Sequence, residues 1–257
     1  MDAGDGVGAL GDVADGEDDL GSGGGQPRSV TASFQRARRP EQVEARRAAI
    51  LATAREMLAE RGVTEISLRE LADRVGLAKS NVLRYFDSRE AIFLEVLDQE
   101  WIAWLDAVEA GFASVPAGDA EAVARLLADT LDGRDLLCEL IAAMSGVLER
   151  NITIEFARVF KRRAAANHDR LAALVRGRMP ALDPAGAAFF GGAVFVIIAG
   201  LWPYSRPTEV VATVAAELGA SPDWADFRAH LAEGLANQLA GQVVRGAPRT
   251  GAPRAGG

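Results

Sequence analysis

Polar side chains that can bind nucleic acid lie close together at Lys79, Ser80, Asn81 and Arg84. Their amide, hydroxyl and basic groups suit hydrogen bonds to base edges and to phosphate oxygens. At helical spacing these residues share one face, whereas the apolar Val82 falls on the opposite face. The pattern predicts a short helix that packs through its apolar side and presents its polar side to a ligand.

The residues before this helix supply the element that must position it. Ser67 is a suitable N-cap, and Glu70 completes a capping box with it. Apolar residues recur at helical spacing up to Val75, and Gly76 follows where the chain must turn sharply, which glycine does without a Cβ penalty. The stretch Ser67–Phe86 therefore predicts a helix-turn-helix, whose second helix enters the DNA major groove. A plain helical hairpin with a polar outer face is the alternative.

From about Arg46 to Leu97 the chain resembles the TetR family of one-component bacterial repressors. The first matching element is a predicted helix, Arg46–Gly62, that ends in a glycine C-cap. The last is Tyr85–Ile92, which looks like the family's aromatic end of the recognition helix followed by a capped helix with a basic phosphate-binding residue. Ser88 is suited to cap the helix that follows the recognition helix.

Two residues depart from the family's pattern. Leu83 stands where the family usually has an aromatic residue, and Arg89 where it usually has lysine. Arg89 keeps the charge and can bind a phosphate with two hydrogen bonds. Leu83 lacks a hydroxyl, so we expect the DNA sequence bound here to differ from a typical one.

Together, the residue types and the resemblance predict which side chains touch DNA. Some are expected to reach bases or phosphates, and others to hold the domain on the DNA backbone. The first group is Lys79, Asn81 and Arg84, the second is Arg46, Tyr85 and Arg89, and the remaining expected contacts are Ser67, Arg69 and Ser80.

Charge is distributed unevenly along the 257 residues, whose net charge is −8. Residues 1–20 contain seven acidic residues and no Lys or Arg. Between positions 26 and 95, 13 basic residues outnumber 10 acidic ones, whereas 19 acidic residues outnumber 15 basic ones from 96 onward. The basic excess coincides with the predicted helix-turn-helix, as contact with phosphates requires.

The fold is predicted to be all-α, because no segment has a convincing strand pattern. Residues 1–40 are expected to be a disordered acidic tail and a basic arm, which either touches DNA or is a solvated linker. Residues 41–95 form the predicted three-helix head, 96–244 a helical ligand-binding and dimerisation body, and 245–257 a disordered tail. The expected body helices are 91–112, 120–131, 135–148, 151–177, 185–202, 208–218 and 222–244.

Residues 187–202 carry no charge, so a membrane span has to be considered. The stretch is shorter than the ~20 residues that a span needs and contains three glycines, which favours a buried helix of a soluble protein. The resemblance implies a homodimer that pairs Ala185–Trp202 and Trp224–Val243 in a four-helix bundle across a two-fold axis.

The resemblance also implies a small effector bound between helices of the body. The candidate lining residues are mostly large and apolar, which predicts a mainly apolar ligand, and ordinary core packing is the alternative for each. They are Trp101, Trp104, Leu137, Met144, Phe156, Phe160, Phe189 and Phe195, with Asn151, Glu155 and Asn167 able to orient a ligand.

The sequence does not support catalysis, a metal site or a cofactor. His168 and His230 are the only histidines, and no Cys, His or carboxylate cluster has metal-ligand spacing. Cys138 is the only cysteine, which excludes an intrachain disulfide and fits an inert buried thiol in a reducing cytoplasm. The chain start also lacks the pattern of a secretory signal.

The sequence therefore predicts a cytoplasmic transcriptional regulator. It is expected to be a repressor that places the helix Lys79–Tyr85 in the major groove of a palindromic operator and is released by the effector. Two alternatives remain open. One is a helical small-molecule binding protein or enzyme whose head has lost DNA binding, with Leu83 as the only hint. The other is a membrane-associated protein anchored through 187–202.

Overall fold

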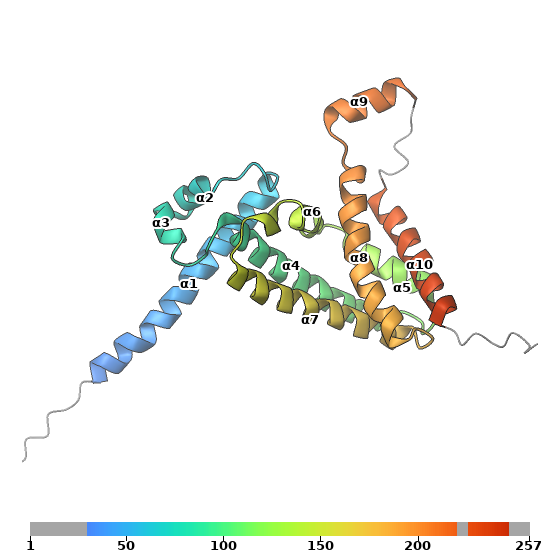
Figure 1. The fold of residues 1–257 in the computed structure, drawn as a ribbon, viewed down its shortest axis with the longest axis horizontal. Coiled ribbons are helices and arrows are strands. Elements are labelled where there is room, and N and C mark those ends of the chain that lie inside the picture. Colours follow the sequence, from blue (N-terminus) through green and yellow to red (C-terminus); the bar gives the residue numbers. More distant parts are fainter. Residues whose placement is uncertain (1–29, 220–225, 247–257) are drawn as a thin grey trace, which may run out of the picture. The chain divides into compact units, whose positions relative to one another are not determined.

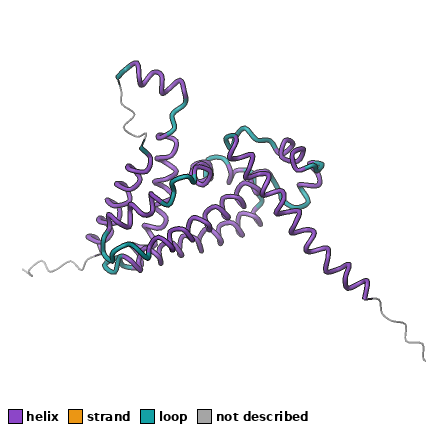
Figure 2. The backbone as a smooth tube through the Cα atoms, turned by 180° about the vertical axis from the view of Figure 1, so that it is seen from behind, coloured by secondary structure: helices purple, strands orange, loops and turns teal. Residues whose placement is uncertain are grey.

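The computed structural model describes residues 30–219 and 226–246 (Figure 1). Throughout these ranges the regular elements are helices (Figure 2), which confirms the predicted all-α fold. By contact, the chain divides into two compact units, Met1–Glu41 and Gln42–Gly257. The helices are α1 Val30–Glu60, α2 Leu68–Val75, α3 Lys79–Val82, α4 Arg89–Phe112, α5 Ala120–Asp129, α6 Asp135–Met144, the 3₁₀ turn η1 Leu148–Arg150, α7 Ile154–Arg178, α8 Pro184–Ser205, α9 Glu209–Glu217 and α10 Phe227–Gly246.

Helix α1 begins earlier than the sequence analysis predicted. Residues 30–40, expected to belong to a disordered arm, are helical, and Pro40 lies inside the helix. Alanine, glutamine and arginine residues in this stretch have favourable helix propensities, which the prediction of a disordered tail did not weigh. The rest of the predicted N-terminal tail and the predicted C-terminal tail from 247 lie outside the described residues.

The head of the second unit comprises the rest of α1 together with α2 and α3. Its core is apolar and fully enclosed, since the side chains that line it retain almost no exposed surface. The members from α1 lie at the helical spacing that the sequence showed. The core residues are Ile50, Ala54, Met57, Leu58, Ile66, Leu71, Ala72, Val82 and Phe86.

Helix α4 connects the head to the body. It packs against α5, α6 and α7, while α8 packs against α6, α7 and α10, and α10 packs against α5 (Figure 1). Trp101 and Trp104 of α4 lie at the centre of this core, with at most 1% of their surface exposed. The body is thus a layered helical bundle built around one continuous apolar core.

Helix α8 is longer than the sequence analysis predicted. It runs past the expected end at Trp202 to Ser205, with Pro203 inside it, and its 22 residues make it long and apolar enough to span a membrane. One side of α8, however, contributes Phe190, Val194 and Ile198 to the body core. On that side, α8 is apolar because it packs against other helices of the body.

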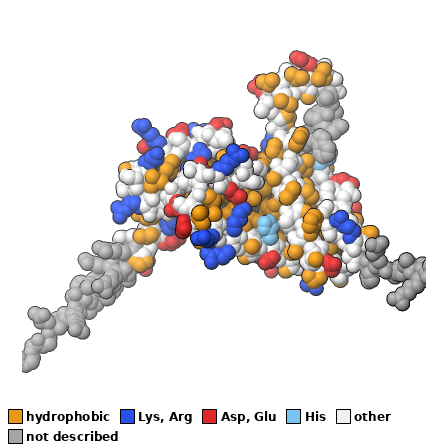
Figure 3. Space-filling view, in the orientation of Figure 1, with side chains coloured by type: hydrophobic (Ala, Val, Ile, Leu, Met, Phe, Trp, Pro, Cys, Tyr) orange, Lys and Arg blue, Asp and Glu red, His pale blue; other side chains and the backbone are white. Residues whose placement is uncertain are grey.

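Helix α9 contrasts with α8, because none of its residues is buried. Hydrophobic side chains gather over this helix in Figure 3. They include Val210, Val214 and Leu218, all of which are exposed.

Candidate nucleic-acid interface

Helix α2 begins at the predicted capping box. The Glu70 backbone N–H donates to Ser67 Oγ at 3.2 Å, and the Ser67 backbone N–H donates to Glu70 Oε2 at 2.8 Å. The Ser67 backbone N–H and side chain, together with the Arg61 guanidinium, lower the pKa of the Glu70 carboxyl from 4.5 to about 2. The cap thus holds a carboxylate at the positive end of the helix dipole.

The turn after α2 is formed as predicted. Gly76 has a φ of 74°, in the left-handed region that favours glycine, and the Leu77 N–H donates to the Ala72 carbonyl at 2.9 Å. This turn brings α3 across α2, where Val82 inserts into the head core.

Helix α3 is shorter than the predicted helix Lys79–Tyr85. It ends at Val82, and the next residues form a tight turn in which the Tyr85 N–H donates to the Val82 carbonyl at 2.9 Å. The Tyr85 carbonyl accepts instead from Arg47 Nη1 of α1, at 2.5 Å. The Arg47 side chain thus satisfies a carbonyl oxygen at the end of this turn.

We call the side chains of Lys79, Ser80, Asn81 and Arg84 the recognition face. All four are exposed, and they make no hydrogen bond or ion pair within the described part of the chain. Asn81 and Arg84 also line a surface hollow of about 410 Å³, together with Arg46 and Val43 of α1, Leu77 and Tyr85. The structure therefore brings Arg46 beside the recognition face, although it lies more than thirty residues away in the chain.

The remaining predicted contacts are placed differently. Arg69 is exposed on α2, with Nε 3.9 Å from Asp73 Oδ2, whereas Ser67 is held in the helix cap. Only part of the predicted set therefore surrounds the hollow, namely Arg46, Asn81, Arg84 and Tyr85.

Arg89, which the sequence analysis assigned to a DNA phosphate, forms hydrogen bonds within the protein. Its Nη1 donates to the Ile66 carbonyl at 2.7 Å, and its Nη2 donates to Glu90 Oε1 at 2.7 Å. Glu90 is buried, and its second oxygen accepts from Asn151 Nδ2 at 3.1 Å. The partly exposed guanidinium is therefore paired with Glu90, and these contacts link the head to the segment before α7.

Thr153 makes a second link between the head and the body. Thr153 Oγ1 donates to Asp87 Oδ2 at 2.7 Å and also caps α7 by accepting from the Phe156 N–H. Asn151, expected to orient a ligand, thus belongs to the connection between head and body. Asn167, expected to do the same, donates to Asp98 Oδ1 at 3.0 Å inside the body.

Arg47 is a positioning residue that the sequence analysis missed. Besides its bond to Tyr85, its Nη2 donates to both oxygens of Glu95 on α4, at 2.6 and 2.7 Å. Its guanidinium also lies 4.3 Å from the centre of the Phe86 ring. The signal was its position on the same helical stripe as Ile50 and Ala54, which places it on the inner side of α1.

The predicted effector-lining residues are mostly packed together in the body core. The centroid of the Phe195 ring lies 4.0 Å from that of Trp101 and 6.0 Å from that of Trp104. Leu137 and Phe160 are buried, whereas Met144 and Phe156 are half-buried.

Phe189 is the exception and corrects the prediction. It is 59% exposed on the outer side of α8, since it lies on the helix face opposite the buried Phe190 and Val194. Cys138, in contrast, is fully buried as predicted, and burial raises the pKa of its thiol to about 12.

A capped helix, a glycine turn and a short helix with an unpaired polar outer face define a helix-turn-helix DNA-binding protein. Residues 50–96 match the bacterial regulatory proteins of the tetR family, and residues 98–246 match the tetracyclin repressor-like C-terminal domain. The chain belongs to the TetR family of DNA-binding transcriptional regulators, which are not enzymes.

Individual relatives are more distant. The chain is 35% identical over 83 residues to the HTH-type transcriptional regulator RutR of Escherichia coli K12, a match that spans 31% of this chain and 39% of RutR. Among solved structures, Thermus thermophilus FadR in complex with lauroyl-CoA has a TM-score of 0.52 at 19% identity, covering 82% of this chain and 100% of that one. A transcriptional regulator from Rhodococcus sp. RHA1 has a TM-score of 0.52 at 17% identity, covering 77% of this chain and 94% of that one. These likenesses show the fold.

Proposed function

We propose that the protein is a cytoplasmic repressor that binds a palindromic operator as a homodimer and leaves it when a small molecule binds. The observation that carries the proposal is the recognition face, which is exposed and makes no contact within the described residues that would compete with DNA. Unpaired basic and amide groups on a short helix suit the major groove. Lys and Arg side chains over the head in Figure 3 suit contact with phosphates.

In this proposal Lys79, Asn81 and Arg84 reach bases or phosphates, and Arg46 and Tyr85 hold the DNA backbone at the edge of the same hollow. Ser67, Arg69 and Ser80 supply further backbone contacts. Arg89 is reassigned from a phosphate contact to a residue that positions the head, because each of its three side-chain nitrogens already donates a hydrogen bond within the protein.

The dimer is proposed to form through the outer faces of α8 and α10. On α8, Phe189, Val196 and Tyr204 are 59%, 73% and 75% exposed. They follow one another at helical spacing and form an apolar stripe on the side away from the body core. A second copy would remove this stripe from water and gain roughly 1.5–3 kcal/mol for each large side chain buried. Trp224, part of the expected interface, lies outside the described residues.

Release by an effector is proposed to act through α4, because this helix contacts both the head and the body. On the head side, Arg55 Nε donates to Glu100 Oε1 at 2.6 Å, in addition to the Arg47 pair. A ligand that prefers one position of α4 would shift the separation of the two heads in a dimer. Thermus thermophilus FadR, a TetR-family repressor bound to lauroyl-CoA, supports control by a small molecule, although its ligand is not transferred to this chain.

The test is capture of genomic DNA fragments by the full-length protein, followed by sequencing. A Lys79→Ala/Asn81→Ala double variant is the matched control, because both side chains are exposed and their loss leaves the head core intact. We expect a palindromic motif, with half-sites about one helical turn (~34 Å) or somewhat more apart, that only the natural sequence enriches. Equal enrichment by both proteins would contradict the proposal.

A further inference from the structure

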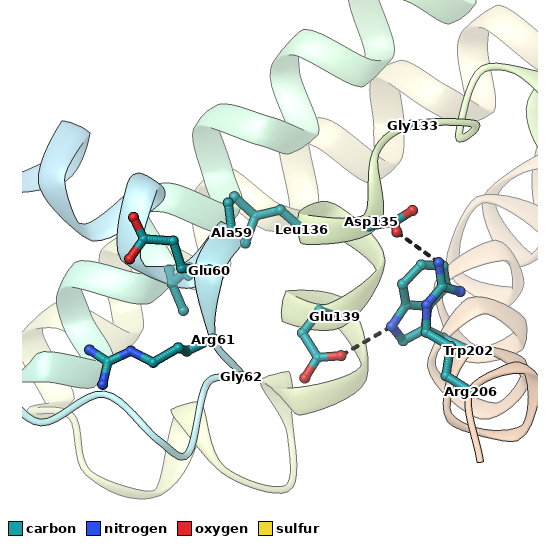
Figure 4. Close-up of a pocket in the computed structure, with 11 residues that line it drawn as sticks. Ala59, Glu60, Arg61, Gly62, Gly133, Asp135, Leu136, Glu139, Trp202 and Arg206 are labelled. Atoms are coloured by element: carbon teal, nitrogen blue, oxygen red, sulfur yellow. Dashed lines mark hydrogen bonds and ion pairs between the residues drawn. The ribbon is translucent and has the colours of Figure 1, made fainter. Parts of the chain in front are cut away.

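Two adjoining hollows lie where the α1–α2 connection, α6 and the end of α8 meet. Their volumes are about 470 and 630 Å³, which is the range of small-molecule sites. They share a wall made of Glu139, Trp202 and Arg206 (Figure 4). We call the larger one the junction hollow; it is lined by Val63 and Thr64, by residues between Glu139 and Val147, and by residues between Trp202 and Val211.

Glu139 is the only acidic residue in this lining. It is half-buried, and its Oε2 accepts a hydrogen bond from Trp202 Nε1 at 3.1 Å. No Lys, Arg or His of the described residues lies within ion-pair distance of it. A cation bound in the hollow would form a charge-assisted pair with this carboxylate.

Arg206 does not supply that cation, although it lies in the same wall. Its guanidinium stacks 3.5 Å from the centre of the Trp202 ring, and its Nη2 is 2.8 Å from Asp135 Oδ2. Figure 4 shows these two interactions on one side of Trp202 and the Glu139 contact at the indole nitrogen. The charge of Arg206 is therefore committed to Asp135, and that of Glu139 is left unmatched.

The rest of the junction hollow is mostly apolar. Ala142, Ala143 and Val147 line it from α6 and the turn after it, and Pro203 and Val211 line it from α8 and α9. We propose that the junction hollow binds a hydrophobic organic cation, with its positive group against Glu139 and its apolar body against these side chains. An anion of the same shape is disfavoured by the unmatched carboxylate.

The position of the hollow also assigns the ligand a role, which rests on the proposed function. Val63 and Thr64 belong to the head, whereas Glu139 and Ala142 belong to the body. A ligand that touches both would favour one spacing between them, and this difference in affinity is what a regulatory ligand requires. We infer that the hydrophobic cation is the effector.

The test uses tetraphenylphosphonium and tetraphenylborate, which have closely similar shapes and opposite charges. Isothermal titration calorimetry on the full chain, without DNA, is expected to show binding of the cation and at least tenfold weaker binding of the anion. Equal binding of the two ions, or no binding of the cation, would overturn the proposal.

Glu139→Gln tests the carboxylate itself, since the amide oxygen can still accept from Trp202. We expect it to lower the affinity for the cation at least tenfold, whereas Glu121→Gln, an exposed acid on α5, leaves it unchanged. Ala143→Phe, which fills the hollow but keeps Glu139, should lower it as well. An unchanged affinity in either junction variant, with thermal unfolding showing a folded protein, would refute the site.

A separate measurement tests the role. Fluorescence anisotropy with a captured DNA fragment is expected to show that tetraphenylphosphonium weakens DNA binding by the natural chain but not by Glu139→Gln. Unchanged DNA affinity with the cation bound would overturn the effector role. Failure to capture any specific fragment would instead overturn the proposed function and leave the calorimetric result standing.

Discussion

The head and the start of α4 carry arginines on two faces that differ in what surrounds them. Beside α3, Arg46 and Arg84 line an open hollow and have no carboxylate partner in the described residues. Toward α4, Arg47 and Arg89 are paired with Glu95 and Glu90. The same residue type is thus left available to phosphates on one face and used for architecture on the other, and the neighbouring carboxylates make the difference.

The largest expected effect is on the inner face. Arg47→Ala should lower the free energy of unfolding by about 3 kcal/mol, because it removes two charged hydrogen bonds and leaves the mostly buried Glu95 without a cation. Urea unfolding followed by circular dichroism measures this. Arg46→Ala is the control for the neighbouring exposed position and should change stability little. Equal effects of the two substitutions would remove the distinction between the faces.

On the outer face, Asn81→Ala should act on sequence preference instead of stability. We expect it to weaken binding to the captured operator by about 1–3 kcal/mol and to leave binding to random DNA nearly unchanged, because amide contacts read base edges. Fluorescence anisotropy on both DNAs provides the measurement. Equal losses on the two would contradict its assignment to a base.

Salt dependence sharpens the comparison between Arg84 and Arg89. Arg84→Ala should weaken all DNA sequences and reduce the slope of log affinity against log salt by about one, as the loss of one phosphate contact does. Arg89→Ala should leave that slope unchanged and lower stability, since its donors bind Ile66 and Glu90. Binding titrations at several salt concentrations decide between them. A reduced slope for Arg89→Ala would restore its role at a phosphate.

The smallest expected effect concerns the cap of α2. Ser67→Ala should lower the free energy of unfolding at pH 7 by about 1 kcal/mol, the usual cost of losing an N-cap. Because folding lowers the pKa of Glu70 from 4.5 to about 2, the stability it contributes is complete above pH 4.5 and lost as the pH falls toward 2. The natural chain should therefore exceed Glu70→Gln in stability at pH 6 but not at pH 2, as thermal unfolding at both pH values would show.

Local signals in the sequence predicted the local features of the head. Ser67, Glu70 and Gly76 lie within ten residues, and each acts on backbone groups of its own neighbourhood, so the cap and the turn were predicted correctly. The predicted end of α3 was wrong: the helix ends at Val82, and the Tyr85 carbonyl in the turn after it accepts from Arg47 of α1. The contacts of Arg89 were not predicted either, because its partner Ile66 lies 23 residues away in the chain.

In the body, too, local features were predicted and long-range arrangements were not. The helical pattern predicted most helices, and Trp101 and Trp104 were rightly expected inside, since burial follows from apolar type and spacing. Apolar type alone failed for Phe189, which lies on the outer face of α8. The junction hollow was not predicted, because it is lined by three separate segments of the chain.

By itself, the sequence determined the all-helical class, the helix-turn-helix and the family, because helix periodicity, capping residues and glycine turns act over a few neighbouring positions. Only the tertiary structure decided which charges are paired. Arg46 and Arg47 are adjacent in the chain, yet one faces the open hollow and the other binds Glu95 on α4. That difference depends on which helices pack together, since a carboxylate neutralises an arginine only when folding places it within a few ångströms.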